Sequence, residues 1–542
     1  MNSFSIRNGA RIAALFAALA GAAHAQPVNW TVVGGQNPVV PMAPMQAAGD
    51  RAIESAGWTD GGSRWGFWTS QAPDTGWWTR QPNGTLQRFM ALGVTGTTGP
   101  GRGGAESGHT FAQRFDDAYD GGIDGKRAFL ARAGAANAYT DGVWLWDGAR
   151  NIEIARSTAN AGTLGPGAGA DWSFAAGDRY SLLRVGADGE VMIDSQVRHT
   201  GGATSDVVTK YVPGVGNRAC AMARSADPLL GPNLTAGDTF SYWNGAASRS
   251  VDASGRMFGW FATEGFRSGL WELCNGAPRG LAVDGETGGR GPGIALAPDA
   301  KFGVFNSGAV LGAPGLASFA ATVYLTPQAG APTNGIFRYN GAGNRPLALA
   351  GDTGDLSPHW NGATFSSFVW ESLDAAGRYV TFSAFVNTAS GSRVGLWRAG
   401  SNAGPQPVAI LGDTGAYSPG GGLTWTDLYE RTIFAGGDIA LIARTSDGQV
   451  ALWLLSEGRA PQRLLAVGQA IGVPTASGTA QAAIATIATS GGAIAARSRS
   501  GNDTWAGADG SVLLRVTTTP SYDTLWVAAK AGDRIFQDGF ND

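Results

Sequence analysis

The residues in this sequence that best suit chemistry are the acids of three short loops with the pattern Gly-(Glu/Asp)-Thr-Gly. These loops cover residues 285–288, 351–354 and 412–415 and contain the acids Glu286, Asp352 and Asp413. Carboxylate and carbonyl oxygens suit Ca²⁺, which takes about six to eight oxygen ligands. A turn is the competing interpretation, because Asp and Thr accept local backbone N–H bonds and Gly adopts positive φ. A fourth copy, at 93–96, has Val in place of the acid, which favours the turn over a calcium site.

Cys220 and Cys274 are the two cysteines of the chain, so a single intramolecular pairing exists. They lie in successive copies of the repeat described below, and an oxidising compartment would join them. We therefore predict a disulfide, with two buried thiols as the alternative. The four histidines lack the spacing of zinc ligands. No cofactor is expected apart from the calcium alternative.

Familiar catalytic motifs are missing from the sequence. It contains no Gly-x-Ser-x-Gly elbow with a triad order, no His-Glu-x-x-His and no P-loop. Residues 250–255 and 372–377 approach the Asp-box of sialidases, Ser-x-Asp-x-Gly, with one extra residue before the Gly. Since that box is itself a turn, it keeps a glycosidase only as an alternative.

Sequence repeats identify the elements that must position these loops. An aromatic residue that follows a Gly or apolar residue recurs at positions 78, 144, 271, 337, 397 and 453. A degenerate copy at Tyr211 and a partial copy at Trp505 complete eight points with a spacing of roughly 60 residues. Each period contains four short alternating runs bounded by Gly, Asp, Asn and Pro, the signature of strands.

Four strands per repeat predict an all-β fold, a β-propeller of about eight four-stranded blades. Seven blades is the alternative if the copy near Tyr211 is an insertion. The repeated Trp residues are predicted to fill the space between blades. The last repeat lacks a clear fourth strand, which residues 29–33 or 524–527 could supply, so that the two ends of the chain meet.

Composition agrees with many short strands joined by turns. The 542 residues include 84 Gly and 25 Pro, and only 15% are charged. Such a composition excludes a coiled coil or helical bundle, and 43% hydrophobic residues argue against disorder. A net charge of −3 without basic runs disfavours nucleic-acid binding.

The N-terminus predicts export. Residues 1–25 combine Arg7 and Arg11 with a short apolar stretch and Ala23-His24-Ala25, which is typical of a signal peptide cleaved between Ala25 and Gln26. A retained anchor is the alternative. No later stretch is long and apolar enough for a transmembrane helix. We expect the propeller to cover residues 26–530, a C-terminal tail to cover 531–542, and the protein to lie outside the cell, in the periplasm or at the cell surface.

Two short motifs resemble those of known bacterial proteins. Residues 122–129, Gly-Ile-Asp-Gly-Lys-Arg-Ala-Phe, are similar to the repeat of the "NxxGxxAF" secreted proteins, with Gly in place of Asn. Residues 535–540, Ile-Phe-Gln-Asp-Gly-Phe, resemble the "IFxDGF" tail of bacterial secreted proteins. The first resemblance implies a secreted β-repeat protein without an assigned activity, and the second implies a sorting or processing tag.

These observations favour a secreted or surface-associated protein that is non-catalytic. Its expected role is binding or structural, with a polysaccharide or another surface macromolecule as partner. A carbohydrate-active enzyme, either a glycosidase or a lyase, on the same scaffold is the alternative.

Overall fold

The computed structural model describes most of the predicted propeller. The described residues are 29–34, 53–59, 64–69, 75–80, 86–114, 121–123, 125–135, 138–159, 162–175, 180–186, 188–235, 237–241, 243, 249–252, 256–294, 297–306, 310–312, 315–325, 331–400, 404–475, 478–489, 511–519 and 525–530. The predicted signal peptide with Ala25 and Gln26, Trp505 and the tail 531–542 lie outside them.

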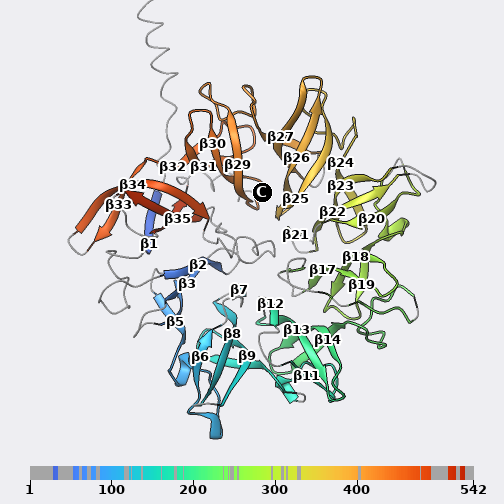
Figure 1. Ribbon diagram of the computed structural model, residues 1–542, viewed down its shortest axis with the longest axis vertical. Coiled ribbons are helices and arrows are strands. Elements are labelled where there is room, and N and C mark those ends of the chain that lie inside the picture. The colour runs from blue at the N-terminus through green and yellow to red at the C-terminus, as the bar shows by residue number, and fades with distance from the viewer. Residues whose placement is uncertain are drawn as a thin grey trace, which may run out of the picture.

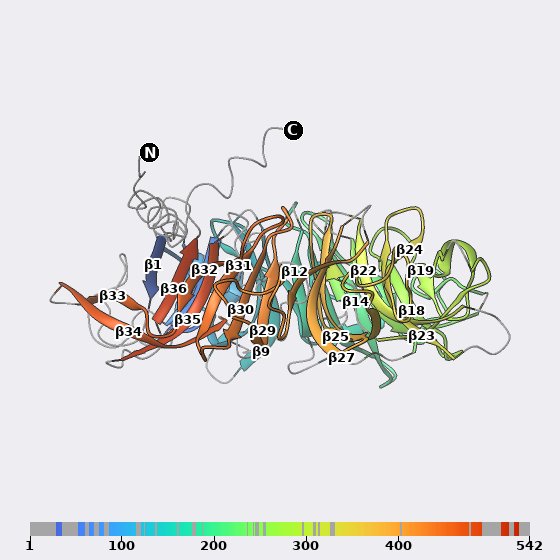
Figure 2. The same cartoon turned by 90° about the horizontal axis from the view of Figure 1, so that it is seen from above.

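Eight antiparallel sheets stand around a central axis and form an eight-bladed β-propeller (Figure 1). Seen from the edge, they make a disc (Figure 2). The predicted all-β propeller with eight blades is thus confirmed. Tyr211 belongs to a complete blade, not to an insertion. Among the described residues no helix is long and apolar enough to cross a membrane.

The blades follow one another along the chain. Blade 1 consists of β2 (Ile53–Thr59), β3 (Arg64–Thr69), β4 (Gly76–Arg80) and β5 (Leu86–Ala91). Blade 2 consists of β6 (Thr110–Arg114), β7 (Gly121–Ile123), β8 (Lys126–Ala135), β9 (Ala138–Trp146) and β10 (Asn151–Arg156). Blade 3 consists of β11 (Trp172–Phe174), β12 (Tyr180–Val185), β13 (Val191–His199), β14 (Thr204–Val212) and β15 (Gly216–Met222). Blade 4 consists of β16 (Arg249–Val251), β17 (Met257–Ala262), β18 (Ser268–Leu273) and β19 (Arg279–Val283).

The second half of the ring has the same plan. Blade 5 consists of β20 (Lys301–Phe305), β21 (Val310–Leu311), β22 (Ala317–Tyr324), β23 (Thr333–Tyr339) and β24 (Asn344–Leu349). Blade 6 consists of β25 (Thr364–Ala376), β26 (Tyr379–Thr388), β27 (Gly391–Ala399) and β28 (Gln406–Ile410). Blade 7 consists of β29 (Trp425–Ile433), β30 (Ile439–Thr445), β31 (Val450–Leu455) and β32 (Gln462–Ala466). Blade 8 consists of β33 (Ala470–Thr475), β34 (Gly478–Thr489), β35 (Ser511–Thr519), β36 (Leu525–Lys530) and the N-terminal β1 (Asn29–Gly34). The short 3₁₀ turns are η2 (Gly96–Thr98), η3 (Gly104–Glu106), η4 (Gly162–Leu164) and η5 (Gly288–Arg290).

Blade 8 closes the ring by pairing the two ends of the described chain. β1 lies antiparallel to β36, with Asn29 opposite Lys530. Residues 29–33 therefore supply the missing fourth strand, as the first of the two alternatives predicted. Residues 525–527 lie instead in β36, the strand between β35 and β1. Val527 directly follows the register shift between β36 and β1, as Trp453 directly follows the shift between β31 and β32.

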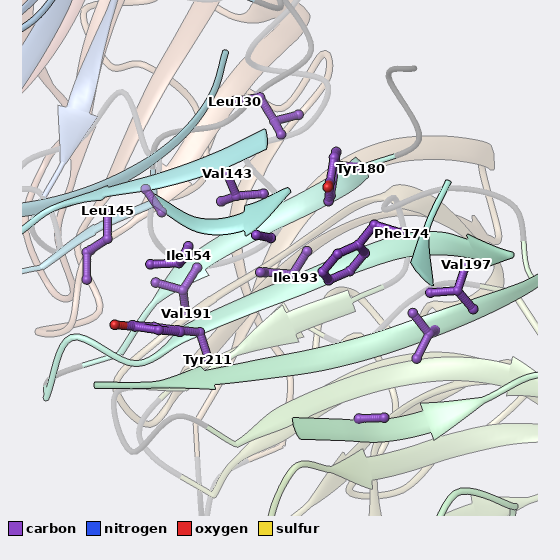
Figure 3. Packing of buried hydrophobic residues seen from close by; sticks show 14 of the residues in the cluster. Leu130, Val143, Leu145, Ile154, Phe174, Tyr180, Val191, Ile193, Val197 and Tyr211 are labelled. Carbon is purple, nitrogen blue, oxygen red and sulfur yellow. The ribbon is translucent and has the colours of Figure 1, made fainter. Parts of the chain in front are cut away.

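Apolar side chains of neighbouring blades fill the space between them. Figure 3 shows Leu130, Val143 and Ile154 of blade 2 facing Phe174 and Ile193 of blade 3. The repeated aromatic side chains are buried, and Trp144, Trp271 and Trp397 are inaccessible to solvent. The prediction that these Trp residues form core is confirmed.

Loops that join the fourth strand of one blade to the first strand of the next share one architecture, and we call them connectors. In each of the six connectors from blade 1 to blade 7, the N–H of an early residue donates to the carbonyl of an aromatic residue at the start of the next blade. The donor and acceptor pairs are Gly93–Phe111, Thr158–Phe174, Arg224–Phe240, Gly285–Phe302, Gly351–Phe365 and Gly412–Trp425. All six donors have positive φ, a conformation that favours Gly.

A Pro in these connectors ties them to the blades. The indole N–H groups of Trp144, Trp271 and Trp397 donate to the carbonyls of Pro100, Pro232 and Pro358 at 3.0, 3.1 and 3.1 Å. At three blade boundaries an Asn at the start of the fourth strand also donates to the preceding blade; these residues are Asn151, Asn217 and Asn344. These hydrogen bonds satisfy the indole and amide N–H groups at the boundaries where they form.

Candidate functional site

The connectors define one face of the disc, which we call the connector face. Because strands within a blade alternate in direction, the turns between second and third strands reach this same face. The turns between third and fourth strands reach the opposite face. The Gly-(Glu/Asp)-Thr-Gly loops begin their connectors, so they recur on the connector face as the spacing predicted.

Each of the three predicted acids lies at a different blade boundary. One oxygen of Asp352 accepts the N–H groups of Gly354 and Leu356 at 2.9 and 3.0 Å. Asp413 accepts those of Gly415 and Tyr417 at 3.1 and 3.0 Å. Glu286 forms an ion pair with Arg267. The structure therefore gives Asp352 and Asp413 the turn role.

Calcium binding by these acids stays a prediction of the sequence. Among the residues that the structure describes, no three His, Cys, Asp or Glu side chains gather where they could hold a metal ion. The three acids stand one repeat apart, so each would need its own set of ligands. The connector that contains Asp352 also contains the exposed His359, whose ring contacts the carbonyl of Gly354 rather than Asp352.

A disulfide joins Cys220 in β15 to Cys274, which directly follows β18. Both side chains are buried, and the bond links blade 3 to blade 4. The structure describes no other cysteine. This boundary is therefore held by a covalent bond in addition to the apolar packing between blades 3 and 4.

The two turns that approach the Asp-box also serve the fold. Asp252 accepts the backbone N–H of Arg256 at 3.0 Å and forms an ion pair with its guanidinium. Asp374 accepts the N–H groups of Ala375 and, across the blade boundary, Ile433. Burial raises the pKa of Asp374, because the ionised carboxylate loses its hydration. Arg256 also lies 3.6 Å from the buried carboxylate of Glu272, so its guanidinium is shared between Asp252 and Glu272.

An extended charge network, which the sequence reasoning missed, lies beneath the first connector. Arg102 donates from Nε and from an Nη to both oxygens of Glu153 at 2.9 and 2.6 Å. Arg156 also bonds Glu153, and it bonds Glu106 at 2.9 and 3.1 Å. The side chains of Arg102 and Glu153 are only 3% and 7% exposed. We call Arg102, Glu106, Glu153 and Arg156 the blade 2 network.

The chemistry of this network is that of a structural ion cluster. A general acid needs a raised pKa so that it holds a proton at neutral pH. The hydrogen bond from Arg156 instead lowers the pKa of Glu106, and that carboxylate stays ionised. Nδ1 of His109 lies 3.0 Å from an Nη of Arg102. Since a guanidinium only donates, that nitrogen accepts the hydrogen bond. The charged groups of the network thus pair with one another.

A hollow of about 240 Å³ opens in the connector between blades 3 and 4. Its lining comes from that single connector and includes Asp227, Asn233, Thr235 and Asp238. Asp227 accepts the N–H of Leu229 at 2.8 Å through one oxygen. The Asp238 carboxylate accepts no hydrogen bond from the described residues, and it faces the next turn of blade 4. The hollow thus presents carboxylate, amide and hydroxyl groups to solvent.

Phe266 stands beside this hollow with its ring in solvent. It is 95% exposed, the highest value among the large hydrophobic side chains that the structure describes. Its φ is +61°, which costs an L-residue roughly 1–2 kcal/mol. The β17–β18 turn that contains it contacts Thr239, the residue after Asp238 of the hollow, because Glu264 N–H donates to Thr239 O at 2.9 Å. A Cβ on Gly265 would lie 3.9 Å from Oδ1 of Asp238.

Ion pairs flank the turn of Phe266 on both sides. Arg224 Nε donates to Glu264 at 2.8 Å, and Arg267 bonds Glu286 and the carbonyl of Asp284. Arg224 replaces the Gly that starts most connectors, with a φ of +54°. Strained non-Gly residues cluster at functional sites more often than elsewhere. We call the hollow together with Phe266 the blade 4 patch, and it is the candidate functional site.

A smaller polar cluster lies on the first two strands of blade 7. Asp427 and Tyr429 in β29 and Arg444 in β30 are each more than two fifths exposed to solvent. Arg444 lies 5.7 Å from the Tyr429 ring centre and 3.4 Å from the Asp427 carboxylate. Leu428 pairs with Ala443 and Arg431 with Leu441, so Tyr429 sits in a β-bulge, a device that re-aims side chains. β29 is the strand of blade 7 drawn nearest the centre of the ring (Figure 1).

Comparisons with known proteins give fold-level similarities only. No family model matches the sequence, and no curated protein matches it significantly. The β-propeller domain of the Trilobed protease from Pyrococcus furiosus aligns with 9% identity and a TM-score of 0.31, over 77% of this chain and 95% of that one. A polysaccharide lyase of family PL25, an ulvan lyase, aligns with 11% identity and a TM-score of 0.27, over 79% of this chain and 95% of that one.

Prolyl oligopeptidase B from Galerina marginata is a third similar structure. It aligns with 7% identity and a TM-score of 0.34 over 80% of this chain. This chain spans about half of that enzyme, 55% of its length. Since similarities of this strength indicate no activity, the functional argument rests on the blade 4 patch itself.

Proposed function

We propose that this protein is a non-catalytic binding protein that acts outside the cytoplasm and holds a polysaccharide on its connector face at blade 4. The exposed ring of Phe266 carries the proposal. The predicted signal peptide and the Cys220–Cys274 disulfide support the location.

An aromatic ring in solvent beside polar groups matches the chemistry of a sugar. The C–H face of a pyranose is apolar and can cover an aromatic ring, while its hydroxyl groups need hydrogen-bond partners. In the blade 4 patch Phe266 supplies the ring and the side chains of Asp227, Asn233 and Thr235 supply partners. The hollow is smaller than the roughly 300–1,000 Å³ of enclosed ligand sites, which suits one sugar unit of a chain that continues across the surface.

A rigid frame supports the patch. The disulfide ties blade 3 to blade 4 beneath it, and Trp271 bonds Pro232 of the same connector. Sites built on rigid supports lose less entropy when a ligand binds.

Replacing Phe266 by Ala tests the proposal. The intact protein would be run in native gels that contain individual soluble polysaccharides, and retardation would be measured for each. We expect at least one polysaccharide to retard the wild type, and F266A to lose most of that retardation. Val215→Ala is the matched control, because Val215 is 74% exposed but lies in a turn on the opposite face. Retardation that F266A leaves unchanged would refute the proposal.

A carbohydrate-active enzyme is the second candidate, and the cluster at Asp427, Tyr429 and Arg444 favours it. A carboxylate, a phenol and a guanidinium in mutual contact are groups that sugar cleavage uses. Under this alternative, incubation with a bound polysaccharide would release new reducing ends or unsaturated products, and Asp427→Asn would abolish them. Bound polysaccharide that stays intact would leave the non-catalytic function as the conclusion.

A further inference from the structure

We infer that the blade 4 patch selects glycans that bear a positive charge, namely polymers of amino sugars with free amines. The inference rests on the proposed function, since it names the class of sugar that the same site would take. Its basis is the imbalance of charge around the hollow.

The lining of the hollow contains two acids and no cation. Asp227 and Asp238 are its ionisable members. Asp227 gives one oxygen to the N–H of Leu229, which leaves the other oxygen for a ligand. No described residue donates a hydrogen bond to the carboxylate of Asp238. Both groups are thus placed to accept N–H bonds from a ligand in the hollow.

The neighbouring cations already have carboxylate partners. Arg224 pairs with Glu264 at 2.8 Å, and Arg267 pairs with Glu286. Four carboxylates therefore face two guanidinium groups in and around the patch, so the local charge is negative. A uronic acid or a sulfated sugar would be repelled there, while an ammonium group would gain a charge-assisted hydrogen bond.

The position of Phe266 adds a second attraction to the same ligand. An ammonium group on a sugar stacked against the ring would lie near its face, which carries the negative part of the ring quadrupole. The aromatic ring orients the sugar, and the carboxylates select its charge. A neutral sugar would use the ring and gain only ordinary hydrogen bonds from the acids.

The test compares two oligosaccharides with the same sugar backbone, one with free amines and one with uncharged acetamide groups. Binding of a glucosamine hexamer and of an N-acetylglucosamine hexamer to the intact protein would be measured by calorimetry. We expect the amine form to bind at least about tenfold more tightly, a difference of about 1.4 kcal/mol. The D227N/D238N variant should lose that preference, so that its affinities for the two hexamers become similar. D227N retains an oxygen for the N–H of Leu229, so the turn should persist.

A matched control comes from Asp147, which also accepts backbone N–H groups in an exposed turn, on the opposite face. D147N should leave both affinities unchanged. Equal affinities for the two hexamers, with both lost in F266A, would overturn the charge selection and leave the proposed function intact. Amine binding that needs the acids but ignores F266A would be simple ion exchange and would overturn the inference. If F266A changes the affinity of no glycan, the proposed function itself fails.

Discussion

The connectors 92–109 and 223–239 start from the same architecture and end with opposite properties. In both, the indole N–H of a buried Trp donates to the carbonyl of a connector Pro. In both, a backbone N–H near the start of the connector donates to the carbonyl of an aromatic residue of the next blade. Two residues after the Pro, the first connector has Arg102 and the second has Leu234. In the first, charges fill the space and pair with one another. In the second, a hollow remains open and its acids face solvent.

In other connectors, the residue two positions after the Pro is apolar. Ala168, Ile294 and Trp360 occupy it in three other connectors, and each packs against a hydrophobic cluster. Arg102 therefore departs from the repeat, and Glu153 and Arg156 compensate for its charge. The comparison teaches that a departure from a repeat indicates a ligand site only where its polar groups are left for solvent. A departure whose groups satisfy one another indicates a local solution to packing.

The largest expected effect comes from breaking the blade 2 network. Arg102→Ala would leave Glu153 buried with only Arg156 as partner, and removal of one member of a buried pair costs about 3–5 kcal/mol. The shift in the urea midpoint of unfolding measures it. Replacing Arg102 and Glu153 together by Leu should cost less than R102A alone, because no charge is left stranded between them.

The control for this prediction is Arg150→Ala, since Arg150 is mostly exposed and pairs with Asp147 at 3.9 Å. Such a surface change should stay within about 0.5 kcal/mol. If R102A were equally mild, the network would be no more structural than the open patch, and the contrast between the two connectors would fail.

A smaller effect of opposite sign is expected at the blade 4 patch. Phe266→Gly would remove the strain of a positive φ at position 266. Because Gly also increases the entropy of the unfolded chain, the net gain in the free energy of unfolding should be at most about 1 kcal/mol. Thermal unfolding measures the gain, and the native-gel assay should show that binding is lost. Phe258, which is buried in β17, supplies the contrast, because F258G would destabilise strongly. A clear loss of stability in F266G would mean that the ring packs within the fold and is not held out for a ligand.

The smallest effect concerns the dependence of the blade 2 network on pH. The hydrogen bond from Arg156 lowers the pKa of Glu106, so the folded state binds that proton less tightly than the unfolded chain does. Its contribution to stability is therefore present above the unfolded pKa of Glu and is lost as the pH falls through the folded value. When the pH is lowered from 7 to below the folded pKa of Glu106, the thermal midpoint of E106Q should therefore fall less than that of the wild type.

The buried Asp374 acts in the opposite direction over acidic pH, because burial raises its pKa. It is unchanged in E106Q, so its contribution cancels in the comparison of the two proteins. An acid limb that is identical in wild type and E106Q would show that the network adds nothing to acid stability.

Much of the fold follows from the sequence because the repeat is strong. The spacing of Trp144, Trp271 and Trp397 predicted the blades and their buried aromatics, and residues 29–33 were one of the two alternatives predicted for the closing strand. The connector prolines were missed, although Pro100, Pro166, Pro232, Pro292, Pro358 and Pro419 follow one another at 66, 66, 60, 66 and 61 residues. Each follows a Gly or a Ser, a signal as regular as the Trp spacing.

The candidate site was harder to predict because it depends on what surrounds each residue. Asp352 and Asp413 have the more suggestive sequence, yet their oxygens bind the turns in which they lie. Phe266 sits in the unremarkable segment Thr-Glu-Gly-Phe-Arg, and its exposure arises because the turn ends beyond the blade. Arg102 and Glu153 are 51 residues apart, a separation that offers no local signal.

What the sequence by itself determined is the period of the chain: alternating apolar residues, Gly at positive φ and aromatics at a fixed phase specify strands, turns and blades through local rules. Only the tertiary structure decided which polar groups are paired within the protein and which are left exposed to solvent. A carboxylate binds its own turn, a buried Arg or nothing at all according to neighbours from other strands and blades. Because hydration and pairing depend on those neighbours, the same Asp or Arg becomes architecture at one blade boundary and a surface for a ligand at another.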